Sequence, residues 1–199
     1  MCHDVTASCN LAAPMHISTD ARIPFPVPVV FAAYRDDLTK LLPYLPNVRS
    51  IEVKSRRDAG ATVEFVNEWH GGGDIPAAVR AVLSEAILSW TDYATWSSTE
   101  HACDWRIQTH AFTDAVQCSG RNRFVEDGAG ATRLEVRGTL SIDAKKIRGV
   151  PSLLASTVGR AAEDFLVNKI QSNLVETAQG LAKYLGEKAA AKTIDMTRR

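Results

Sequence analysis

Residues 103–143 read CDWRIQTHAFTDAVQCSGRNRFVEDGAGATRLEVRGTLSID, and this stretch decides the fold. Apolar or small residues alternate with charged or polar ones through three successive segments, at 103–111, 117–126 and 132–143. A period of two is typical of β-strands that have one buried face and one solvated face. Short polar stretches separate the segments, so we predict three antiparallel strands joined by turns.

The register of these strands follows from where the turns are placed. Turns at Thr113-Asp114 and at Asp127-Gly128-Ala129 would pair Ile107 with Gly120 and Gly120 with Val136. A slip of one residue would exchange the two faces of a strand, so the apolar pattern restricts which pairing registers are possible. One face is then dry and carries Trp105, Ile107, Thr109, Cys118, Gly120, Asn122, Phe124, Leu134, Val136, Gly138, Leu140 and Ile142. The other is wet and includes Arg106, Arg121, Arg123, Arg133 and Arg137, which we expect to form a solvated charge lattice with Glu135 and Asp104.

Two consequences of this register concern small side chains. Cys103 and Cys118 lie too far apart along the hairpin for a disulfide, so we expect free thiols. Gly120 and Gly138 fall close together on the dry face, and glycine inside a strand often marks the close approach of another backbone. We predict that the final helix makes this approach.

The same reasoning extends to the rest of the chain. We predict a strand at 15–23, short helices at 29–34 and 37–45, and further strands from residue 48, around 63–69, at 78–86 and at 89–97. A long amphipathic helix is expected from Pro151 to Gly186, where apolar residues recur every three or four positions. We expect a single domain at 15–188, a disordered arm at 1–14 and a frayed tail at 189–199.

Composition excludes several classes of function. The 199 residues are 45% hydrophobic and 23% charged, and 23 basic residues balance 23 acidic ones. A net charge of zero gives no broad attraction to nucleic acid, and no apolar run is long enough to span a membrane. Residues 1–14 lack the pattern of a secretory signal, and the four cysteines show no zinc-site spacing. We therefore expect a cytoplasmic protein, a monomer or weak dimer, with no metal and no cofactor.

The predicted order is a strand, two short helices, a run of antiparallel strands and one long helix. Together with the segments IPFPVPVVF at 23–31, LPNV at 45–48 and the closing strand at 130–140, this order resembles the START-like or Bet v 1-like helix-grip superfamily. The resemblance implies an α+β fold in which a six- to seven-stranded antiparallel sheet wraps around the C-terminal helix. It also implies a cavity between the sheet and that helix.

The resemblance and the strand phase together give candidate ligand-binding residues. The polar or aromatic residues with inward phase are Asn67, Trp69, Trp90, Trp96, Trp105, Thr109 and Asn122, and Phe165 is added from the helix. Each has a structural alternative, because buried tryptophans build cores and a buried asparagine needs a hydrogen-bond partner whether or not a ligand is present.

Catalysis is the alternative function that the resemblance suggests, because relatives include polyketide cyclases that use acid–base residues. Glu85 shares its phase with Val79, Ala81 and Leu83 and is the candidate catalytic carboxylate, whereas Arg80 has the opposite phase. His70 and His110 have outward phase, so we interpret them as surface histidines.

Three functions remain open at this point. The first is the binding or carriage of a hydrophobic small molecule such as a lipid, quinone or polyketide-like compound. The second is a cofactor-free cyclase, aromatase or dehydratase that uses the same cavity. The third is a protein-interaction module, which would require an exposed apolar patch.

Overall fold

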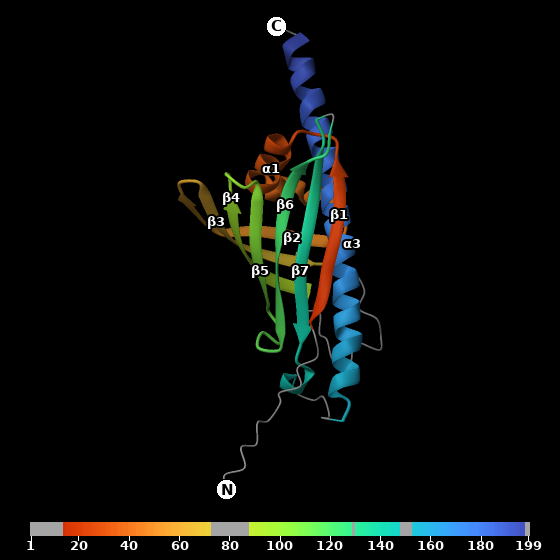
Figure 1. Cartoon of the computed structure of the whole chain (residues 1–199). Helices are drawn as coiled ribbons and strands as arrows, with labels where there is room; N and C mark the ends of the chain where they lie inside the picture. Colours follow the sequence, from red (N-terminus) through yellow and green to blue (C-terminus); the bar gives the residue numbers. More distant parts are fainter. Residues whose placement is uncertain (1–13, 73–87, 129, 148–152, 198–199) are drawn as a thin grey trace.

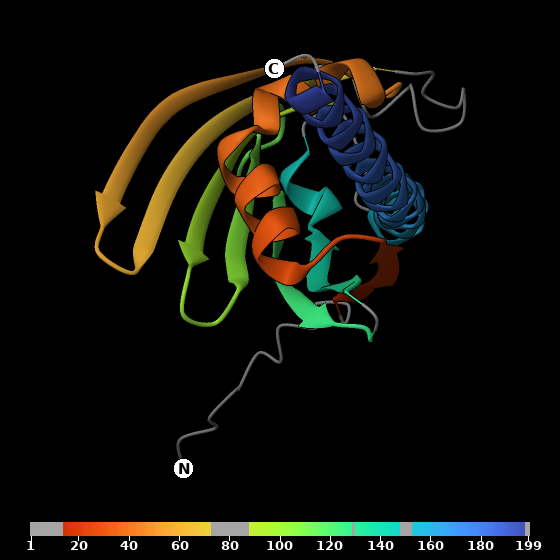
Figure 2. The same ribbon diagram turned by 90° about the horizontal axis from the view of Figure 1, so that it is seen from above.

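The computed structural model describes residues 14–72, 88–128, 130–147 and 153–197. The predicted strand at 78–86, with Glu85 and Arg80, lies outside these residues, as do residues 1–13 of the predicted arm at 1–14. The described chain contains one seven-stranded antiparallel sheet and a long C-terminal helix that lies along the concave face of this sheet (Figures 1 and 2).

The strands follow the predicted segments closely. Their bounds are β1 Met15–Ile23, β2 Val48–Ala59, β3 Thr62–Gly71, β4 Ser89–Ser97, β5 Ala102–Thr109, β6 Val116–Glu126 and β7 Thr132–Ile142. In the sheet the order is β1-β7-β6-β5-β4-β3-β2. The first two strands in the sequence therefore lie at opposite edges, and the chain between them crosses one end of the sheet.

Two short helices make that crossing, as predicted. Helix α1 spans Val27–Asp36 and begins two residues earlier than expected, with Pro26 as its N-cap. Prolines are tolerated in the first turn of a helix because the N–H groups there have no intrahelical acceptor. The second predicted helix is a 3₁₀ helix, η1 Leu38–Tyr44, and another short one, η3 Ala144–Lys146, follows β7.

The predicted register of β5, β6 and β7 is wrong by two residues in each hairpin. Ile107 pairs with Cys118, and Gly120 pairs with Gly138. Both connections differ from the predicted turns. The first is organised around the carbonyl of Phe112, which accepts from Ala115 and Val116, and the second uses the left-handed backbone of Gly128 and Gly130. The two faces of the sheet stay as predicted because a shift of two residues preserves the side-chain phase.

The glycine pair accommodates a side chain rather than the final helix, which corrects the prediction. The indole of Trp105 lies over Gly120 and Gly138. A Cβ atom on Gly138 would lie 2.9 Å from Cη2 of Trp105 and 2.7 Å from the carbonyl oxygen of Ser119. Both distances are too short for a real side chain, so the two glycines allow the Trp105 ring to lie flat on the inner face of the sheet.

The long helix, α3, spans Ala155–Thr197 instead of Pro151–Gly186. It is thus helical through most of the predicted tail, whereas the domain limits 15–188 stay a prediction. Helix α3 lies close to η1 at Gly180, where a Cβ would lie 2.9 Å from the carbonyl oxygen of Tyr44. In the described ranges, no helix is both long and apolar enough to cross a bilayer.

The core consists of two clusters along α3. One lies near α1 and includes Ala178, Leu181 and Leu185 of the helix, and the other includes Ala162 and Leu166. Trp105 and Leu174 are partly buried and pack against both clusters.

Candidate functional site

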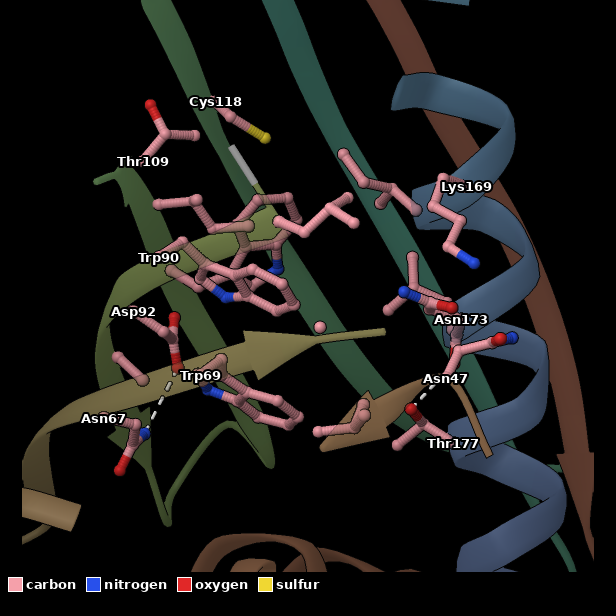
Figure 3. Close-up of a pocket in the computed structure, with 18 of the residues that line it drawn as sticks. Asn47, Asn67, Trp69, Trp90, Asp92, Thr109, Cys118, Lys169, Asn173 and Thr177 are labelled. Carbon is pink, nitrogen blue, oxygen red and sulfur yellow. Dashed lines mark hydrogen bonds between the residues drawn. The ribbon is translucent and has the colours of Figure 1, made fainter. Parts of the chain in front are cut away.

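A cavity of about 180 Å³ lies between the concave face of the sheet and α3 (Figure 3). An apolar cavity of about 150 Å³ is enough to bind benzene, so this one has room for a small aromatic group. Strands β3 to β6 supply most of one wall and α3 supplies the opposite wall. The lining includes Tyr34, Leu38, Val48, Leu88, Ala94, Cys103, Ile107, Val116, Cys118, Leu140, Leu166, Ile170 and Leu174, together with the polar and tryptophan residues described below.

Two tryptophans and two polar residues form a square on the inner face of β3 and β4. Asn67 pairs with Asp92 across the two strands, and Trp69 pairs with Trp90 two residues further along. The two indoles are nearly parallel, with ring centroids 5.7 Å apart and an interplanar angle of 11°. We call these four residues, Asn67, Trp69, Trp90 and Asp92, the inner-face square.

Asp92 is the unusual member of this square. Its carboxylate accepts a hydrogen bond of 3.2 Å from Nδ2 of Asn67. Burial raises the pKa of Asp92 to about 6, and the Asn67 hydrogen bond offsets only part of this effect. A carboxyl group with this pKa changes its charge close to neutral pH and can both accept and donate a proton there.

Within the described parts of the chain, three polar atoms of the cavity lining are buried without a hydrogen-bond partner. They are Oδ1 of Asn67, Nε1 of Trp69 and Oδ1 of Asn173. Asn67 itself is only 2% exposed. A buried polar atom without a partner costs about 1–3 kcal/mol, so each of these atoms would gain from a ligand group of the right kind.

The helix wall carries a polar stripe of its own. Lys169, Asn173 and Thr177 are spaced by four residues, which places them on one face of α3, and all three line the cavity. Thr177 is held in place because its hydroxyl donates to the backbone carbonyl of Asn173 at 2.7 Å. Figure 3 shows Lys169 on the helix side, across the cavity from Asp92.

Other predicted site residues are engaged in the structure of the wall. Nε1 of Trp105 donates to Oδ1 of Asn122 at 2.8 Å, and the Thr109 hydroxyl donates to the carbonyl of Ala111 at 2.8 Å. Trp96 lies in an aromatic group with Phe31, Tyr34 and Phe124.

The structure brings together most of the residues predicted for the site. Seven of them line the cavity: Asn67, Trp69, Trp90, Trp96, Trp105, Thr109 and Asn122. Phe165 is not among the lining residues and packs against the cluster around Leu166 instead. Consecutive side chains on a helix point in different directions. The side chain of Leu166, together with that of Lys169 one turn later, reaches the cavity, and that of Phe165 does not. Ligand contact by any of these side chains remains a prediction.

The sequence did not lead us to several polar lining residues, among them Asp92, Lys169 and Asn173. Asp92 lies two residues after Trp90 and four before Trp96, so its inward phase could have been predicted from the same alternation. The spacing of Lys169, Asn173 and Thr177 is likewise visible in the sequence.

The two histidines face outward, as predicted. His70 contacts Ser89 and Glu68 through its ring nitrogens, at 3.0 Å each, and its ring meets that of His110 edge to face. They do not reach the cavity. Among the described residues, no three His, Cys, Asp or Glu side chains gather in a way that could hold a metal ion.

Cys103 and Cys118 are free thiols, as predicted, and both line the cavity. Burial raises the pKa of Cys118 to about 12 and that of Cys103 well above its usual value. Burial also raises the pKa of Tyr34. All three groups are therefore neutral near pH 7, and neither thiol is set up as a nucleophile.

No protein-family model and no curated protein matches this sequence. Solved structures match over most of its length. The aromatase/cyclase ZhuI from Streptomyces sp. R1128 has a TM-score of 0.62 at 13% identity, covering 89% of this chain and 96% of that chain. This chain has the helix-grip fold. TTHA0849 from Thermus thermophilus has a TM-score of 0.59 at 18% identity, covering 85% and 95% of the two chains.

A third helix-grip structure, norcoclaurine synthase from Thalictrum flavum, has a TM-score of 0.52 at 14% identity, covering 88% of each chain. At these identities the likeness shows the shared fold, as predicted from the order of strands and helices. It does not identify a substrate, because one fold carries many functions.

Proposed function

We propose that this helix-grip protein binds an apolar small molecule in the cavity between the sheet and α3. The observation that carries this proposal is the set of partnerless polar atoms on Asn67, Trp69 and Asn173 in an otherwise mainly apolar lining. Binding sites for small molecules typically combine an apolar wall with a few placed polar groups.

The experiment starts from protein purified from its own host. Native mass spectrometry of the full chain, followed by denaturing extraction, should recover about one lipophilic molecule per chain. The protein freed of this molecule should bind the uncharged dye N-phenyl-1-naphthylamine with a rise in dye fluorescence.

A matched pair of variants on α3 tests whether the cavity is the binding site. Leu174 lines the cavity, whereas its neighbour Val175 is 37% exposed. Leu174→Trp should abolish dye binding because the indole fills the space, and Val175→Trp should leave it unchanged. Equal binding by both variants, each checked for folding by its thermal melt, would contradict the proposal. Ile170→Phe gives a milder filling if Leu174→Trp fails to fold.

Acid–base catalysis is the second candidate function, and Asp92 is the observation that favours it. A carboxyl group with a pKa of about 6 inside an apolar cavity is suited to transferring a proton to or from a bound molecule. The fold accommodates enzymes, since an aromatase/cyclase and norcoclaurine synthase share it. If the extracted molecule is converted on return to the protein, and Asp92→Asn binds it without converting it, catalysis takes precedence over carriage.

A further inference from the structure

The inner-face square contains the half-buried carboxylate of Asp92, which has no positive partner among the described residues. Burial and the Asn67 hydrogen bond are the influences on the pKa of Asp92, and no Lys, Arg or His of the described chain contributes to it. Two of the groups it influences, Tyr34 and Cys103, are weak acids whose own pKa values are raised, so both are neutral near pH 7. Among the described residues, an ionised Asp92 therefore has no countercharge.

The atoms around Asp92 determine which ligand group would fit. The carboxylate accepts from Nδ2 of Asn67, and Oδ1 of the same amide is an acceptor that has no donor among the described residues. The indoles of Trp69 and Trp90 are the next residues on the same face, and aromatic rings attract cations. Figure 3 shows Asp92 beside these two tryptophans and away from Lys169.

A protonated amine matches this arrangement better than other polar groups. It donates several N–H bonds, which suits the two oxygens of a carboxylate, and it brings the positive charge that no described residue supplies. An anion would be repelled by Asp92. A hydroxyl group could donate one hydrogen bond but would leave the half-buried carboxylate uncompensated.

We propose that the inner-face square is a binding site for a protonated amine, and that the ligand of this protein is an aromatic or otherwise apolar amine. This inference rests on the proposed function, since it names the ligand class of the same cavity. The amine lies against Asp92 and Asn67, and the apolar part of the ligand fills the space toward α3.

Amine binding at this place is linked to protons. A cationic ligand favours the ionised form of Asp92, so its binding near pH 6 releases protons. A neutral ligand of the same shape displaces water from Asp92 and favours the protonated form, so its binding takes up protons. Of the titratable groups that face the cavity, Tyr34, Cys103 and Cys118 are neutral in this range, and Lys169 lies on the opposite wall.

The test compares 2-naphthylmethylamine with the uncharged 2-naphthalenemethanol by titration calorimetry of the full chain. At pH 7.5 the amine should bind about tenfold or more tightly than the alcohol. Titrations at pH 6 in two buffers that differ in ionisation enthalpy should show proton release for the amine only. Amine affinity should rise with pH through 6, and alcohol affinity should fall.

In the Asp92→Asn variant the amine and the alcohol should bind with about equal affinity, and amine binding should no longer release protons. Asp114→Asn changes an exposed carboxylate in the β5–β6 connection and should keep both properties. Equal binding of amine and alcohol by the unaltered protein would overturn the amine proposal and leave cavity binding intact. If neither probe binds, both proposals fail. The pH dependence of the unaltered protein decides the matter even if Asp92→Asn does not fold.

Discussion

Without a ligand, Asp92 lowers the stability of the folded protein at neutral pH. Its pKa is about 6 in the folded protein, against 3.8 for a free side chain. The Asp92 carboxyl group therefore loses its proton at a lower pH in the unfolded chain than in the folded protein. The contribution of the protonated carboxyl group to the free energy of unfolding is fully present below about pH 4 and is lost as pH rises through 6.

Asp92→Asn should consequently stabilise the folded protein at pH 7.5 by about 1–3 kcal/mol, because a shift of one pKa unit corresponds to about 1.4 kcal/mol. At pH 4 the two proteins should differ little. Urea unfolding at both pH values measures this difference, with Asp114→Asn as the neutral control. A variant that is less stable than the unaltered protein at both pH values would show that Asp92 is a structural residue.

The sequence predicted only some of the residues that line the cavity. Inward phase placed Asn67, Trp69 and Trp90 in the cavity wall correctly. The same phase includes Asp92, a residue type that is rarely buried. Which of the two buried asparagine oxygens, that of Asn67 or that of Asn122, accepts a hydrogen bond depends on the ring position of Trp105, because this ring donates to Asn122. No sequence pattern reports such a choice.

Asp37, at the junction of α1 and η1, ties these short elements to the last third of α3. Its carboxylate accepts hydrogen bonds from the Tyr184 hydroxyl and from Lys188 of α3, each at 2.8 Å, and from Lys40 at 2.7 Å. Burial alone would raise the pKa of Asp37, but these three donors outweigh it and lower the pKa to about 2. These contacts hold the junction of α1 and η1 against α3.

Asp37→Asn should lower the free energy of unfolding by about 1–2 kcal/mol at pH 7, as expected for charged hydrogen bonds with partly exposed partners. The sign of the pH dependence is opposite to that of Asp92. This stabilisation is present above about pH 4 and is lost as pH falls through 2. Thermal melts from pH 7 to pH 2 would show the two proteins converging in acid. Tyr184→Phe, which removes one donor, should cost less than Asp37→Asn, and an unchanged melting temperature in both variants would contradict this role.

At the scale of elements, strand positions were predictable and strand pairing was not. The two-residue period located β1, β4 and β7 to within a residue at either end. The register depended on turn geometry, and Phe112 adopts a positive φ that no propensity favours for a large side chain. The ends of α3 were also missed, because helix ends depend on caps and on what the end packs against.

On the whole molecule, the outer face of the sheet carries the arginine lattice that the wet strand phase predicts. Arg137 pairs with Asp20 at 2.6 Å, Arg133 with Glu135 at 3.0 Å, and Arg121 with Asp104 at 3.3 Å. Basic and acidic residues number 23 each. Each of these three arginines therefore lies against a carboxylate of the opposite charge.

The protein should accordingly show no binding to a 20-base-pair DNA duplex at 150 mM salt, with a Kd weaker than about 10⁻⁴ M, the weak end of non-specific binding. Fluorescence anisotropy of labelled DNA measures this. The charge-reversed variant Asp20→Lys/Glu135→Lys removes the carboxylates that pair with Arg137, Arg133 and Arg123 and should bind measurably. Tight binding by the unaltered protein would mean that a basic surface exists elsewhere on the chain.

The order of strands in the sheet has a consequence for how the molecule is made. β1 is synthesised first and pairs with β7, which is synthesised last among the strands, and α3 follows both. Chains emerge from the ribosome N-terminus first, and pairings between distant segments form slowly. The tryptophan-lined inner face therefore meets water until α3 docks. A ligand present during synthesis would cover this surface while the nascent chain is prone to aggregate. The supply of ligand would therefore affect the yield of folded protein as well as the fraction of protein that carries a ligand.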